Sequence, residues 1–89
     1  MNNNEKSVGI SKLVPRFLGF GDAYDHLEQL KKISRVYEPI IEATKVAAFG
    51  LTLDDQADIW FRTLVEDIVI DFDFVIEDFL TNFAWHENK

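Results

Sequence analysis

The stretch that decides the fold covers residues 53–85, LDDQADIWFRTLVEDIVIDFDFVIEDFLTNFAW, and contains neither glycine nor proline. Its apolar residues recur at steps of three and four, the spacing that places side chains on one face of an α-helix. This main apolar face comprises Ala57, Trp60, Phe61, Leu64, Ile68, Phe72, Val75, Ile76, Phe79 and Phe83. The pattern predicts one continuous helix over 53–85, roughly 45–50 Å long, with Thr52 as its N-cap.

Residues 68–76 within this stretch leave a second interpretation open. They read IVIDFDFVI, are rich in β-branched and aromatic residues, and alternate apolar with acidic side chains at their centre. That pattern is typical of a strand. The helical spacing continues in phase on both sides of the segment, and for this reason we favour a helix.

The preceding residues, 22–50, also show helical spacing. Asp22 follows a glycine and is a suitable N-cap. Pro39 removes a backbone donor, but the apolar stripe stays in phase across it, which favours a kinked helix over 22–49 rather than two helices. Gly50 is expected to close this helix. We therefore predict an all-α fold, an antiparallel helical hairpin of the kinked helix and the long helix.

The first 21 residues form a short arm that is polar at first and then apolar. Pro15 excludes a long regular element there, so we expect a short helix or irregular segment over 13–18 that lays apolar side chains on the hairpin. With 89 residues the chain is one small helical domain, 1–89. A hairpin and an arm bury little apolar surface, and we expect two copies to form a homodimeric helix bundle.

The charge of the chain is negative and unevenly spread. The 16 acidic and 9 basic side chains give a formal charge of −7, and residues 51–89 carry ten acids against two bases. Such a surface repels nucleic acid and anionic lipid and attracts basic proteins. No apolar run approaches the roughly 20 residues that span a bilayer, and the first residues lack the pattern of a signal peptide. We expect a cytoplasmic protein that binds neither membrane nor nucleic acid directly.

On a helical wheel, the acidic residues of 53–85 fall into two stripes. The first stripe consists of Asp55, Glu66, Asp73 and Glu77. The second consists of Asp67, Asp71 and Asp78. Between them, opposite the main apolar face, lies a second apolar strip of Ile59, Ile70 and Phe74. We expect the stripes to bind a basic partner, and the strip to be covered by the arm or by a second subunit. A merely solvated acidic face is the alternative for the stripes.

Residues 70–75, IDFDFV, resemble the first motif of the haloacid dehalogenase phosphotransferases. That resemblance implies a strand whose first aspartate is the nucleophile and whose second is a general acid and base, with bound magnesium. It covers only six residues, and too little chain follows for the α/β domain of that family. The same aspartates do not complete a calcium loop, which needs a glycine at the position of Ile76 and a glutamate at that of Asn82.

Other chemical motifs are also incomplete. The two histidines, His26 and His86, lack the glutamate three residues earlier that di-metal helix bundles use, and we expect His26 on a solvated face. The chain has no cysteine, which excludes disulfides and thiolate zinc sites. A small basic patch on the first helix is expected to pair with neighbouring glutamates. It comprises Lys31, Lys32 and Arg35, near Glu28 and Glu38. We expect no enzyme, cofactor or metal.

A binding function remains, in one of two forms. The first is a small inhibitor that engages a basic partner surface and mimics DNA to block a nucleic-acid-binding enzyme. Inhibitors of phages and mobile elements, such as anti-restriction and anti-CRISPR proteins, are similar by type. The second is a scaffold, immunity or assembly-chaperone protein that holds its partner through apolar surface. Salt distinguishes the two, because only charge-based binding weakens strongly as ionic strength rises.

Overall fold

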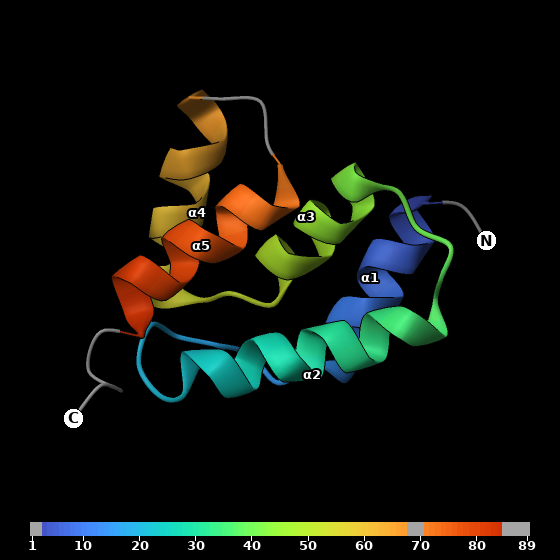
Figure 1. Cartoon of the computed structure of the whole chain (residues 1–89), viewed down its shortest axis with the longest axis horizontal. Coiled ribbons are helices and arrows are strands. Elements are labelled where there is room, and N and C mark those ends of the chain that lie inside the picture. The colour runs from blue at the N-terminus through green and yellow to red at the C-terminus, as the bar shows by residue number, and fades with distance from the viewer. Residues whose placement is uncertain (1–2, 68–70, 85–89) are drawn as a thin grey trace.

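The computed structural model describes residues 3–67 and 71–84, and within them the fold is all-α, as predicted. No strand occurs in these two ranges, apart from an isolated parallel bridge between Phe17 and Leu53. The elements are α1 (Asn3–Leu13), α2 (Ala23–Val36), α3 (Glu42–Leu51), α4 (Asp55–Asp67) and α5 (Phe72–Phe83). Figure 1 shows α1 beside α3, α2 running along one side of the molecule, and α5 between α3 and α4.

The core forms where α1, α2, α3 and α5 meet. Its fully buried residues include Ile10 from α1, Leu30 from α2, Phe49 from α3, and Val75 and Phe79 from α5. Trp60 and Phe61 of α4 are partly buried and pack against this cluster. The main apolar face predicted for 53–85 therefore does face the core in its described residues, because burying that face is what stabilises each helix.

The prediction of one helix over 53–85 is wrong. α4 ends at Asp67, and Asp71 has extended backbone angles (φ −108°, ψ 128°) and caps α5 by accepting a hydrogen bond from the N–H of Asp73. The molecule is 41 Å along its longest axis, shorter than the predicted helix. Thr52 is the C-cap of α3 rather than an N-cap. Of the segment with the alternative strand reading, residues 72–76 are helical, and 68–70 lie outside the described residues.

The prediction of a kinked helix over 22–49 is also wrong. Asp22 is the N-cap of α2 as expected, and its carboxylate accepts a hydrogen bond from the N–H of Asp25 at 3.0 Å. However, α2 ends at Val36 and α3 begins only at Glu42, with a cis peptide bond between Glu38 and Pro39. Proline removes a backbone donor and disfavours helical angles at the residue before it, and here these effects divide the segment into two helices.

The N-terminal arm packs on the rest of the molecule, but its helix precedes the predicted segment. α1 covers Asn3–Leu13, and it packs mainly against α3. Ile10, Val14 and Phe17 are buried. The backbone of Phe17 is bonded on both sides, because its N–H donates to the carbonyl of Thr52 and its carbonyl accepts from the N–H of Asp54. These bonds hold the arm against the α3–α4 connection.

Gly50 lies inside α3 and does not close it as predicted, because the helix continues to Leu51. A Cβ atom at this position would lie 2.3 Å from the ring of Phe61, so the glycine allows α4 to approach α3 closely. Glycine lowers helix stability relative to alanine by about 1 kcal/mol. The close approach of the Phe61 ring explains why a glycine occupies this helical position.

Replacing Gly50 with alanine is expected to lower the free energy of unfolding by about 1–3 kcal/mol, because the Phe61 ring must leave its site. Urea denaturation followed by circular dichroism measures the change. The control is the same substitution in a Phe61→Ala background, where the clash is absent and alanine should be neutral or stabilising. Equal destabilisation in both backgrounds would contradict the explanation.

Candidate functional site

The acidic residues of α5 that the sequence assigns to partner binding divide into two groups. Asp71 and Asp78 are engaged within the fold. Asp71 caps α5, and Asp78 accepts a hydrogen bond from the indole N–H of Trp60 at 2.7 Å and another from the side chain of Asn82. A helix cap and a hydrogen bond to an indole each explain why a carboxylate stands at its position, with no need for a partner protein. These two residues therefore carry no argument for an external site.

Asp73 and Glu77 form the second group. Both are exposed, and neither carboxylate makes a hydrogen bond or ion pair in the described part of the chain. They lie one turn apart on α5, about 6 Å along the helix axis. Phe74, whose side chain is 42% exposed, lies beside them on the helix surface. We call Asp73, Phe74 and Glu77 the acidic face.

The acidic residues of α4 do not continue this row. Because α4 and α5 are separate helices, Asp55 and Glu66 do not share a helix edge with Asp73 and Glu77, and the predicted single stripe of four is wrong. Asp55 is exposed at the start of α4, with a positive φ of 50° that aspartate tolerates better than most residues. Glu66 and Asp67 belong to the last turn of α4, and their side chains lie outside the described residues.

The second apolar strip is also divided between helices. Ile59 on α4 is 60% exposed and Phe74 on α5 is 42% exposed, whereas Ile70 lies outside the described residues. The arm does not cover them, because its Phe17 enters the core against the rings of Phe79 and Phe83. Coverage of Ile59 and Phe74 by a second subunit stays a prediction.

His26 is buried, and the prediction of a solvated histidine is wrong. Its side chain is 6% exposed and packs against the rings of Phe17, Phe49 and Phe79. Its Nε2 atom lies 2.9 Å from the hydroxyl of Thr52, and that hydroxyl donates its only proton to the carbonyl of Phe49. Nε2 must therefore carry the proton and donate to Thr52. This hydrogen bond inside the aromatic cluster joins α2 to the C-cap of α3, so it exists only in the folded protein.

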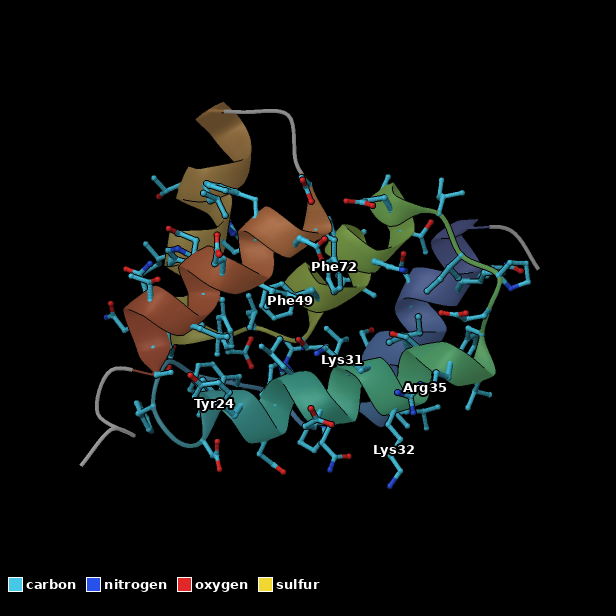
Figure 2. The ribbon with its side chains drawn as sticks, viewed as in Figure 1. Tyr24, Lys31, Lys32, Arg35, Phe49 and Phe72 are labelled. Carbon is cyan, nitrogen blue, oxygen red and sulfur yellow. The ribbon has the colours of Figure 1, made fainter. Side chains whose placement is uncertain are left out.

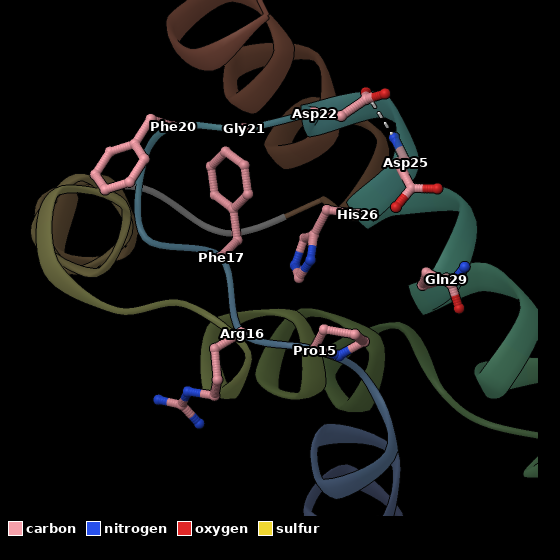
Figure 3. A pocket seen from close by; sticks show the side chains of 9 residues that line it. All are labelled: Pro15, Arg16, Phe17, Phe20, Gly21, Asp22, Asp25, His26 and Gln29. Atoms are coloured by element: carbon pink, nitrogen blue, oxygen red, sulfur yellow. Dashed lines mark hydrogen bonds between the residues drawn. The ribbon is translucent and has the colours of Figure 1, made fainter.

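The hollow next to His26 has a volume of about 210 Å³. Figure 3 shows His26 beside Phe17 at its base, Asp22 and Asp25 on one rim, and the Arg16 side chain directed away from the imidazole. Arg16 is engaged elsewhere, with the carboxylate of Asp54 and the carbonyl of Leu51.

Burial lowers the pKa of His26 to about 4, opposed by the nearby charge of Asp25, so the ring is neutral at pH 7. The Thr52 hydroxyl is fully buried and already donates to a carbonyl, so this pair does not supply a nucleophile and a base.

The structure also bears on the metal and phosphatase motifs. The resemblance to the haloacid dehalogenase motif is not supported, because Asp71 caps a helix and residues 72–75 are helical instead of ending a strand. Within residues 3–67 and 71–84, no group of three or more potential metal ligands lies together. In the same ranges, no helix is both long and apolar enough to cross a bilayer.

Comparisons with protein-family models, with curated proteins and with solved structures give no match to this chain. The assignment of a function therefore depends on the surface chemistry described above.

Proposed function

We propose that this protein binds a basic partner protein through the acidic face of α5. The observation that carries the proposal is the pair of exposed carboxylates of Asp73 and Glu77, which have no partner in the described part of the chain and flank an exposed aromatic ring. Partner surfaces commonly combine an aromatic contact with charged residues around it. Asp55, Glu66 and Asp67 on α4 stay in the proposal from the sequence alone, and the side chains of Glu66 and Asp67 lie outside the described residues.

The helix that carries the acidic face is held rigidly by the core. Val75 and Phe79, on the opposite side of α5, are completely buried. The backbone that carries Asp73 and Glu77 is therefore fixed before binding, so no entropy is lost in ordering the helix. The formal charge of −7 adds a long-range field that steers a basic protein toward this molecule.

Inhibition by DNA mimicry is a narrower form of the proposal. It would need rows of carboxylates, and α5 supplies one pair, so the geometry supports a basic partner in general and not a copied DNA strand. The alternative of a scaffold or assembly chaperone is favoured by one observation, the exposure of Ile59 and Phe74. Homodimerisation through these two residues belongs to that alternative.

Reversing both carboxylates, in the variant Asp73→Lys/Glu77→Lys, is expected to reduce capture of the partner from a host lysate at least tenfold while leaving the fold intact. Loss of close charge pairs lowers both the association rate and the affinity. Wild type and variant are compared by affinity capture with mass spectrometry at low and at high salt. Capture of the same partner by wild type should itself decrease as salt rises.

The matched control is Glu28→Lys/Glu38→Lys, which changes two exposed glutamates associated with α2 and alters the net charge by the same amount. This variant should capture the partner as wild type does. If both double variants lose it equally, net charge and not the acidic face is responsible. A Phe74→Ala variant distinguishes charge-based binding from the apolar alternative. If this variant loses the partner, and capture by wild type does not depend on salt, the binding is apolar.

A further inference from the structure

Three basic side chains line a hollow where α2, α3 and the start of α5 meet, and a fourth lies nearby on the outer side of α2. Lys31, Lys32 and Arg35 belong to α2, and Lys45 belongs to α3. Two hollows of about 170 and 320 Å³ adjoin here, and Lys31 and Arg35 line both of them. Figure 2 shows Lys31 on the side of α2 toward Phe72, and Lys32 on the outer side of the helix. We call the smaller hollow, between α2, α3 and Phe72, the basic hollow.

These four cations are free of ion pairs, and the predicted pairing with Glu28 and Glu38 is not seen among the described residues. Arg16 and Arg62, in contrast, pair with aspartates, and Lys6 donates to a carbonyl. The carboxylates that line the two hollows are those of Glu28 and Glu38, so the linings carry a net charge of +2. This local excess of positive charge attracts an anion at short range, although the overall charge of −7 opposes its approach.

The basic hollow combines donors with an aromatic wall. The residues that line it include Lys31, Arg35, Lys45 and Ser34, with Glu38 as the one lining carboxylate. Phe72 forms the wall, and the Nζ atom of Lys45 lies over the face of its half-buried ring, 6.0 Å from the centroid. The position of Phe72 is fixed, because its N–H donates to the carboxylate of Glu42 at 2.7 Å. Glu42 is thereby engaged in holding the wall in place.

We infer that the basic hollow binds a phosphate monoester attached to a planar ring, of which a mononucleotide is the simplest form. A phosphate monoester carries about −1.5 to −2 charges at pH 7 and three acceptor oxygens, which match the net charge of the lining and its lysine, arginine and serine donors. The planar ring takes the place of the Lys45 ammonium over the face of Phe72, which accepts any base, and Lys45 turns to the phosphate. The site shares no residue with the acidic face, so it stands independently of the proposed function.

Titration of the full chain with adenosine monophosphate, followed by two-dimensional NMR, tests the inference. The expected result is a saturable shift of the amide signals of residues 31–35, Lys45 and Phe72. Adenosine, which lacks the phosphate, and inorganic phosphate, which lacks the ring, should each bind at least tenfold more weakly. Binding of adenosine as strong as that of the monophosphate would overturn the role of the cations.

Lys45→Gln should weaken binding of the monophosphate about tenfold. The matched control is Lys12→Gln, which removes the same charge from an exposed side chain of α1 and should leave binding of the monophosphate unchanged. Phe72→Leu keeps the backbone bond to Glu42 and should weaken the monophosphate about tenfold without affecting inorganic phosphate.

Two results with these variants and with the titration would also overturn the inference. One is an equal effect of Lys45→Gln and Lys12→Gln, and the other is no saturable shift at all. A third outcome assigns the hollow to another occupant and also refutes the proposal. In that case the same signals shift with protein concentration alone, together with those of Asp73 and Glu77, which indicates a second copy of this chain. Circular dichroism of every variant verifies that the fold is retained.

Discussion

Replacing Phe79 with alanine should lower the free energy of unfolding by about 3–5 kcal/mol, the range measured for buried phenylalanines. Phe79 is completely buried and lies at the centre of the aromatic core. Five other rings have their centroids within 6.1 Å of its own, those of Phe17, His26, Phe49, Trp60 and Phe83. Because small domains are stable by only about 5–15 kcal/mol, this loss removes a large part of the total.

The matched control is Phe74→Ala, the same substitution on the same helix. Phe74 is 42% exposed, so its loss should change stability by less than about 1 kcal/mol. Urea denaturation of both variants, followed by circular dichroism, measures the difference. Comparable losses would mean that α5 does not direct Phe79 into the core and Phe74 outward.

Acidification from pH 7 to pH 4 should destabilise the protein by at most about 3 kcal/mol through His26 alone. Folding lowers the pKa of His26 from 6.5 to about 4, mainly by burial, so the unfolded chain takes up a proton that the folded protein resists. The stability is fully present above pH 6.5 and is lost as pH falls from 6.5 toward 4. The proton would add to Nδ1, since Nε2 already donates to Thr52.

The variant His26→Gln isolates this effect. A glutamine amide can also donate to the Thr52 hydroxyl, but it does not titrate, so the loss of stability between pH 6.5 and pH 4 should be much smaller than in wild type. Denaturation curves at several pH values measure both slopes, and NMR titration of the imidazole measures the pKa itself. Arg16 lowers the pKa of Asp54 below its usual value, so that pair responds only at lower pH. Equal slopes in the two proteins would refute the role of His26.

For the candidate sites, the sequence alone could place exposed acids on α5, because Asp73 and Glu77 stand one turn apart on the polar side of a clear apolar stripe. It could not separate them from Asp71 and Asp78, whose carboxylates are engaged by a helix N-terminus and by the indole of Trp60. The sequence also shows the cluster of Lys31, Lys32 and Arg35, but it does not show that Lys45 and Phe72 lie beside that cluster. Those neighbours come from α3 and α5, which the sequence by itself does not place beside α2.

The sequence by itself determined the helical class and the buried side of α4 and α5, because the spacing of apolar residues reflects the helical period directly. Asp22 likewise marked the start of α2. Only the tertiary structure decided where the long apolar stripe is divided, since α4 and α5 both turn their apolar faces to one core and the stripe keeps its phase across the division. The same holds for His26, which is buried because Thr52, 26 residues later, supplies the hydrogen-bond acceptor that makes its burial possible.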